Sequence, residues 1–195
     1  MTSVLPYSPQ HYSSLPSIED ASETLTSDAV ALLTSAIGHV FVKHQVQKLF
    51  GIVLLHNHFT LKDDEILVNF GSVAVPWKTT SSAKQLLDVK GSAWRFTKDG
   101  LVPYEFTHYA YPAADIGGFQ SFLSELRDLL CSFGLVEKLG ICALQDGVGD
   151  RAPQVEFTQG RANITLPFDI DPTEGPDNSI EASWEFESPS ESNSK

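Results

Sequence analysis

The most regular pattern in this sequence is a run of apolar residues at helical spacing in its second half. Successive members of the run are one or three positions apart, and they are Phe119, Phe122, Leu123, Leu126, Leu129, Leu130 and Phe133. This spacing places all of them on one face of a helix. Gly134 follows, and a residue without a Cβ permits the left-handed conformation that ends a helix. We therefore expect an amphipathic helix from about Gly117 to Phe133.

A second amphipathic helix is expected between Ser27 and about Lys43. Ser27 can cap it, and its apolar positions are Val30, Leu33, Ile37, Val40 and Phe41. Each helix leads into an apolar strand, with the sequence KHQVQKLFGIVLLH at 43–56 and FGLVEKLGICALQ at 133–145. The two stretches match when Phe50 is skipped, and His44 then corresponds to Gly134. This similarity predicts an internal duplication of helix-strand-strand units.

Hairpin signals follow both helices. Asp99-Gly100 separates alternating residues at 94–97 and 101–109, and Gln159-Gly160 separates 155–158 from 162–166. Residues 65–70 also alternate, and a short helix is expected near 83–88. The order of helix, strands, helix and strands predicts an α+β fold, with two amphipathic helices packed on a mainly antiparallel sheet.

Acidic residues are concentrated at the two ends of the chain. The net charge is −12 at pH 7, and residues 169–195 hold eight acidic side chains against Lys195 alone. Residues 1–27 contain no Lys or Arg and are rich in Ser, Thr and Pro. These compositions predict a disordered arm at 1–27, one globular domain at 28–168 and a disordered acidic tail at 169–195. Deletion of the tail is then expected to leave the melting temperature almost unchanged.

The tail also contains apolar residues that a docking segment could use, namely Ile180, Trp184 and Phe186. They could dock on the protein's own surface or on a protein partner. The ordinary alternative is that the acidic tail keeps the protein soluble.

Charge and composition also exclude several classes of partner. An acidic surface repels nucleic acid and anionic membranes, so neither is an expected partner. No apolar stretch approaches the roughly eighteen residues of a membrane-spanning helix, and the first residues resemble no targeting signal. A cytoplasmic location is therefore expected. Cys131 and Cys142 lie among apolar residues, which predicts buried, free and unreactive thiols.

The most distinctive candidate for chemistry is the sequence His56-Asn57-His58. Residues two apart on a strand project from the same face, so both imidazoles could bind one divalent metal ion or act as general acid and base. His108 and Glu105 from the hairpin are candidates for a third ligand, and Glu65 is another. Glu105 and His108 are three residues apart, so at most one of them can join without a bulge.

The expected surroundings of this site are aromatic. Tyr104, Phe106 and His108 would share one face of their strand, as the wall of a small-molecule pocket does. At the position equivalent to the histidine pair, the second repeat has Gln145-Asp146-Gly147. The repeated scaffold alone therefore does not require two histidines.

Residues 51–71, which contain the histidine pair, resemble the first motif of the cupin family. In that motif a Gly, a His-x-His pair, a Glu and a second Gly follow in order. Gly51, His56, His58, Glu65 and Gly71 keep that order, although the spacings differ and the second cupin motif is absent. The LLHNHF segment and the Ser-rich arm are also similar to uncharacterised fungal proteins. That second similarity implies no function.

Two functional hypotheses follow. In the first, the protein is a metal-dependent or acid/base enzyme that acts on a small molecule. Its catalytic groups would be His56, His58 and His108. The same three histidines and Glu105 would be the metal ligands. In the second, a non-catalytic binding or regulatory protein docks on a protein partner through its acidic tail.

Overall fold

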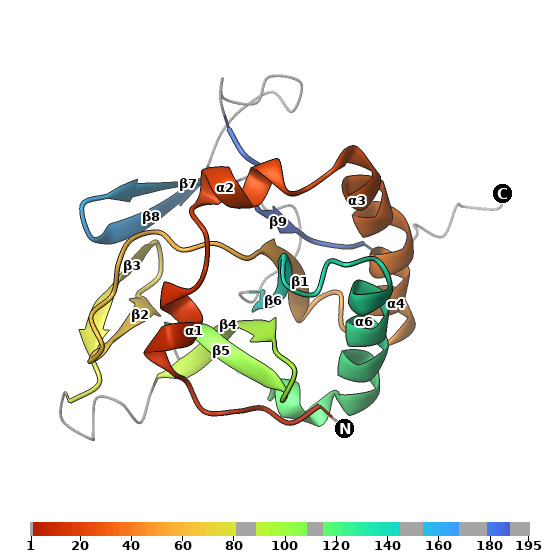
Figure 1. Ribbon diagram of the computed structural model, residues 1–195, viewed down its shortest axis with the longest axis horizontal. Helices are drawn as coiled ribbons and strands as arrows, with labels where there is room; N and C mark the ends of the chain where they lie inside the picture. Colours follow the sequence, from red (N-terminus) through yellow and green to blue (C-terminus); the bar gives the residue numbers. More distant parts are fainter. Residues whose placement is uncertain (1, 81–88, 109–114, 145–153, 168–178, 188–195) are drawn as a thin grey trace, which may run out of the picture.

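The computed structural model describes residues 2–80, 89–108, 115–144, 154–167 and 179–187 (Figure 1). The short helix predicted near 83–88 lies outside these residues. The helices are α1 (Pro9–Ser13), α2 (Ile18–Glu23), α3 (Ser27–Leu32), α4 (Gly38–Lys43) and α6 (Gln120–Ser132), with a π-helical turn at Leu33–Ile37 and a 3-10 turn at Ile116–Gly118. The strands are β1 (Phe50–Leu54), β2 (Glu65–Asn69), β3 (Val73–Lys78), β4 (Lys90–Phe96), β5 (Leu101–Thr107), β6 (Leu139–Ala143), β7 (Gln154–Gln159), β8 (Ala162–Pro167) and β9 (Ser183–Trp184).

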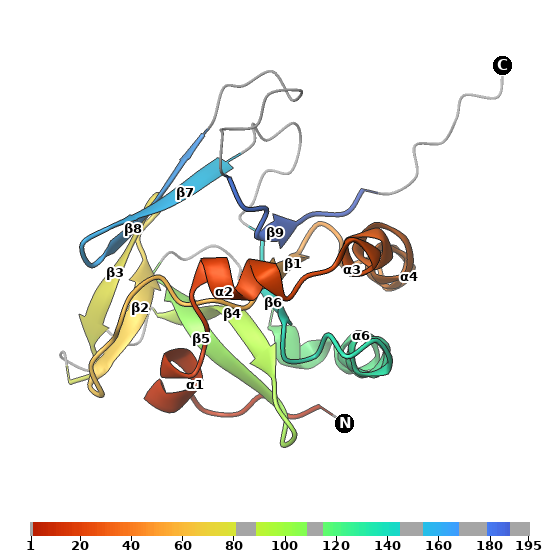
Figure 2. The same cartoon turned by 45° about the horizontal axis from the view of Figure 1, so that its top comes forward.

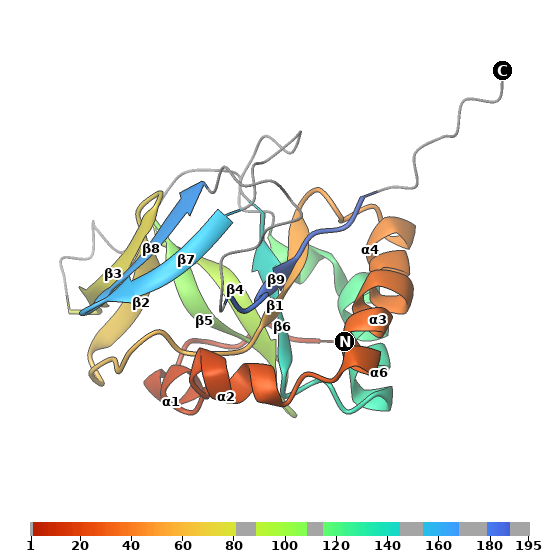
Figure 3. The ribbon, with the colours of Figure 1, turned by 90° about the horizontal axis from the view of Figure 1, so that it is seen from above.

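The described strands form one mixed sheet in the order β7-β8-β3-β2-β5-β4-β6-β1-β9. The pairing of β2 with β5 is parallel, and the other pairings are antiparallel. The prediction of an α+β fold with a mainly antiparallel sheet is therefore confirmed. The sheet is strongly curled, so that the β7–β8 hairpin stands over the strands at its centre (Figures 2 and 3).

The helix predicted between Ser27 and Lys43 is divided by the π-helical turn into α3 and α4. Its cap is Thr26 rather than Ser27, because the Thr26 hydroxyl accepts a hydrogen bond from the amide of Ala29 at 3.3 Å. After α4 the chain reverses at Gln45, which has a φ of 57°. Gly134 has a φ of 68° at the end of α6. A residue in the left-handed conformation therefore follows each of the two helices, and after α4 that residue is Gln45 rather than His44.

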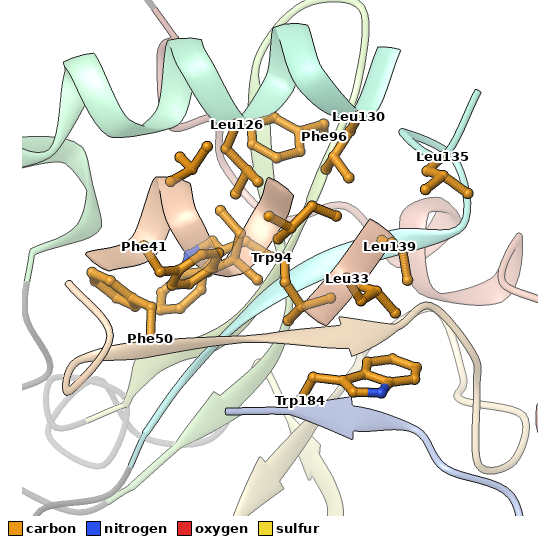
Figure 4. Close-up of a cluster of buried hydrophobic side chains, with 14 of the residues drawn as sticks. Leu33, Phe41, Phe50, Trp94, Phe96, Leu126, Leu130, Leu135, Leu139 and Trp184 are labelled. Carbon is orange, nitrogen blue, oxygen red and sulfur yellow. The ribbon is translucent and has the colours of Figure 1, made fainter. Parts of the chain in front are cut away.

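Aromatic side chains from helices and strands meet in the larger of two buried hydrophobic clusters (Figure 4). Phe122 of α6 contacts Phe41 of α4 edge to face at a ring distance of 4.9 Å, and it stacks on Phe50 of β1 at 6.2 Å. All three are almost completely buried. Burial of side chains of this size stabilises the fold by about 1.5–3 kcal/mol each. The apolar positions predicted from helical spacing thus supply a large part of this core.

The N-terminal region differs from the predicted disordered arm. Its first residues run beside β5, where the amide of Leu5 donates to the carbonyl of Leu101 at 2.8 Å, and α1 and α2 follow. Tyr12 is fully buried and Leu15 nearly so. The prediction relied on average composition, which conceals a few apolar anchors spaced among polar residues.

The tail also differs from the predicted disorder over residues 179–187. Trp184 of β9 pairs with Ile52 of β1, and only 7% of its surface is exposed. The Phe186 ring lies 4.7 Å from the Phe41 ring. These residues therefore dock on the protein's own surface, one of the two arrangements considered for them. The rest of the predicted tail, at 169–178 and 188–195, lies outside the described residues.

The two cysteines occupy different environments. Cys131 is exposed on α6, in contrast to the buried thiol predicted for it. Cys142 lies in β6, and its burial raises the pKa of its thiol to about 12. Within the described parts of the chain, no helix has both the length and the apolar character needed to cross a membrane.

Candidate metal centre

His56 and His58 lie immediately after β1, in the connection that leads to β2. The prediction placed them on a strand, but β1 ends at Leu54. Their rings nevertheless meet, with centroids 4.8 Å apart and planes at 86°. Both side chains are buried, with exposed fractions of 9% for His56 and 6% for His58.

Glu156 completes a cluster of three groups that could ligate a metal ion. Its Oε1 atom lies 3.1 Å from Nδ1 of His58 and 3.9 Å from Nε2 of His56. One ligand atom from each residue falls within 4.8 Å of the others. This is the one such cluster of His, Cys, Asp and Glu among the residues that the structure describes.

The curled sheet brings these residues together. Glu156 lies on β7 at one end of the strand order, whereas the histidines follow β1 near the other end. Figure 3 shows how the β7–β8 hairpin turns over the sheet. The side chain of Glu156 remains 43% exposed, so one side of the cluster is open to solvent.

The other ring nitrogen of each histidine also has a partner. Nδ1 of His56 lies 2.7 Å from the carbonyl oxygen of Leu54, and Nε2 of His58 lies 3.2 Å from Oε1 of Glu105. Both partners are acceptors, so each of these nitrogens can donate to its partner. When a neutral ring carries its proton there, the nitrogen that faces Glu156 has the lone pair that a metal ion requires. Metal-ligating histidines are commonly oriented in this way by a carbonyl or a carboxylate.

The electrostatics of His58 reflect its position between two carboxylates. Burial lowers the pKa of its imidazole, but the hydrogen bond with Glu105 and the charges of Glu105 and Glu156 outweigh burial, so the pKa is raised. Burial works against the charge of Glu156, yet the contact with His56 and the charges of both histidines hold its pKa below the usual value. Groups of opposite charge thus favour the charged forms of His58 and Glu156.

The structure brings three of the predicted site residues together and places the others elsewhere. Glu105 joins the two histidines, but it contacts the side of His58 that faces away from Glu156. The His108 ring stacks at 5.0 Å on Phe70, and His108 is not a member of the three-residue cluster.

Two other expectations about the surroundings of the site differ from the structure. Glu65 is buried and paired with Arg161, which extends from the turn between β7 and β8. The aromatic residues expected on one wall have separate neighbours, because Phe106 packs edge to face on Tyr7 at 5.3 Å whereas His108 lies against Phe70.

Sequence reasoning missed Glu156. The alternation of Val155, Glu156 and Phe157 predicts that Glu156 projects from the opposite face of its strand to its neighbours. Nothing in the sequence indicates that this face meets the histidines, because the contact depends on the curl of the whole sheet. The one sequence feature that could have indicated Glu156 is its place between two apolar residues of a strand, Val155 and Phe157.

Comparison of the chain with protein-family models, with curated proteins and with solved structures found no match in any of the three.

Proposed function

We propose that this protein binds a divalent transition-metal ion through His56, His58 and Glu156, and that the metal centre acts on a small molecule. The observation that carries the proposal is the convergence of Nε2 of His56 and Nδ1 of His58 on one carboxylate oxygen of Glu156, at 3.9 and 3.1 Å. Ligands about 2.0–2.1 Å from a tetrahedral ion are separated by roughly 3.3 Å. The spacing is therefore close to what an ion requires.

The ligand chemistry favours zinc or iron(II). Two imidazoles and one carboxylate form the donor set of many catalytic zinc sites and of iron(II) oxygenases, which keep coordination positions open for water or substrate. The exposed side of Glu156 supplies such an opening. When bound, the ion would act as a Lewis acid towards a water molecule or a small substrate.

The chain's own residues have separate tasks in this proposal. His56, His58 and Glu156 hold the ion, while Glu105 and the carbonyl of Leu54 orient the imidazoles through their second nitrogens. Glu105, considered from the sequence as a ligand, is thus proposed as an orienting group. His108 has no proposed role.

Metal analysis of purified protein tests the proposal. We expect about one equivalent of zinc or iron in the wild-type protein and in His108→Ala, and loss of that metal in His56→Ala/His58→Ala and in Glu156→Gln. The folding of each variant is checked by circular dichroism. A wild-type protein that binds neither zinc nor iron(II) after reconstitution contradicts the proposal.

A second candidate function, acid/base catalysis without a metal, is favoured by one observation. Both ring nitrogens of His58 lie within 3.2 Å of carboxylate oxygens, an arrangement that also suits a proton-transferring imidazole. Small-molecule turnover that persists in metal-free protein and is lost in His58→Ala supports this alternative.

We also propose that the two helix-strand segments arose by duplication, with both helices packing on the sheet. Identical backbone hydrogen bonds support this: the amide of Val46 donates to Phe41, and the amide of Leu135 donates to Leu130. Each donor and acceptor in the first pair is 89 residues before its counterpart in the second. Ile52 and Ile141 have the same offset and face each other in the pairing of β1 with β6. Such a pairing about equivalent residues is what a duplicated segment arranged with approximate twofold symmetry would give.

A further inference from the structure

The backbone between the two histidines is held by the N-terminal segment at residues 7–16. The amide of Asn57 donates to the carbonyl of Pro16 at 2.8 Å, and its side-chain amide donates to the carbonyl of Leu15. The amide of His58 donates to the hydroxyl oxygen of Tyr12 at 3.1 Å. Three hydrogen bonds therefore connect one short segment to the residues that present the imidazoles.

This N-terminal segment is firmly seated on the protein. Tyr12 and Leu15 belong to the smaller hydrophobic cluster together with Leu55, the residue before His56. Arg95 reaches the segment from β4 and donates to the carbonyl of His11 at 3.1 Å. Figure 2 shows α1 lying close to β5, which carries Glu105. The segment and the metal centre thus share both polar and apolar contacts.

We infer that docking of residues 7–16 and metal binding at His56, His58 and Glu156 are cooperative. The inference rests on the proposed function. An undocked segment leaves the backbone at Asn57 and His58 free to move, so the metal ion must then order the histidines at a cost in conformational entropy. A docked segment has already ordered them. By thermodynamic linkage, bound metal must stabilise the docked segment to the same extent.

The chain offers a matched pair of variants for testing this coupling. Tyr12→Phe removes the hydroxyl that accepts from His58, whereas Ser13→Ala removes an exposed hydroxyl that donates to the carbonyl of Pro9 within the segment at 3.0 Å. Loss of an orienting group typically weakens metal binding 10- to 100-fold. We expect the Zn²⁺ dissociation constant to rise about tenfold in Tyr12→Phe and to change less than about twofold in Ser13→Ala. Competition with a chromophoric chelator measures both constants.

The effect of bound metal on the N-terminal segment provides a second measurement. A purely structural role of the segment would not make its protection depend on metal. Zn²⁺ should slow hydrogen exchange of the Asn57 and His58 amides and protect residues 7–16 from limited proteolysis in the wild-type protein. Asn57→Ala, which keeps the backbone bonds but loses the contact with Leu15, should show smaller protection and weaker Zn²⁺ binding. If Tyr12→Phe fails to fold, Asn57→Ala still tests the coupling.

The outcomes separate the two proposals. Wild-type protein that binds no Zn²⁺ overturns the metal centre and with it this inference. Wild-type protein that binds Zn²⁺ with the same affinity as Tyr12→Phe and Asn57→Ala, without metal-dependent protection, overturns the coupling alone.

Discussion

At the scale of single residues, His58 has polar partners on both sides of its ring and at its backbone amide. Glu105 and Glu156 contact its two nitrogens, and Tyr12 accepts from its backbone amide. A buried imidazole with both ring nitrogens and the backbone amide paired has a defined ring orientation, which is what a metal ligand requires.

Glu105→Gln tests whether this orientation matters. The amide keeps the shape of the side chain, but it lacks the negative charge that strengthens donation from Nε2 of His58. We expect the Zn²⁺ dissociation constant to rise by about 10- to 100-fold, with the fold retained. Isothermal titration calorimetry measures the change, and Glu23→Gln, at an exposed carboxylate of α2, is the control. An unchanged affinity would remove Glu105 from the metal centre.

A second prediction at this scale concerns Gln45. Its φ of 57° lies in the left-handed region, which glycine adopts at little cost and which other residues avoid. Gln45→Gly is therefore expected to raise the free energy of unfolding by about 0.5–1 kcal/mol, and Gly134→Ala to lower it by about 1 kcal/mol. Urea denaturation measures both, and equal signs for the two variants would contradict the left-handed conformation of both residues.

At the scale of elements, β9 shows how a two-residue strand can be held in place. Its backbone pairs with β1, and the adjoining carbonyl of Ala182 accepts from Leu54 at 2.7 Å. Trp184 and Phe186 then cover apolar surface that would otherwise be exposed beside α4. Acidic residues alternate with these aromatic ones along 181–187 and are exposed. The segment therefore has one buried and one solvated face.

Trp184→Ala measures the contribution of this segment. Removal of a buried tryptophan side chain lowers the free energy of unfolding by about 3–5 kcal/mol. We expect a clear fall in the melting temperature of Trp184→Ala. Deletion of residues 179–195 should also lower the melting temperature, whereas the composition of the tail predicted almost no change. Glu185→Ala, which changes an exposed neighbour, should leave the melting temperature nearly constant. A Trp184→Ala protein as stable as this control would show that the segment does not dock in solution.

At the scale of the whole molecule, the curl of the sheet decides which distant residues meet. It places Glu156 of β7 over the histidines that follow β1, and the neighbouring turn at residues 160–161 carries Arg161 to Glu65 at the start of β2. Arg161 thereby joins the β7–β8 hairpin to the body of the sheet.

The pairing of Glu65 with Arg161 predicts a pH dependence of stability. The hydrogen bond from Arg161 lowers the pKa of Glu65 below its usual value. The resulting stabilisation is present above the pKa of the unfolded state and is lost as the pH falls through the lower pKa of the folded state. We expect Glu65→Gln to reduce the loss of stability between pH 5 and pH 2, as measured by urea denaturation at each pH. Asp64→Gln, at an adjacent partly exposed carboxylate, is the control. An unchanged pH profile in Glu65→Gln would contradict this role.

Local patterns in the sequence determined much of the secondary structure. Helical spacing defined α6, Asp-Gly and Gln-Gly defined two hairpins, and the His-x-His segment identified two of the cluster's three residues. These features depend on residues a few positions apart, so a sequence displays them directly. The tertiary structure alone decided that Glu156 joins the histidines, that His108 does not, and that Tyr12 and Trp184 are buried. Those contacts join residues more than forty positions apart, and only the curl and packing of the complete sheet bring them together.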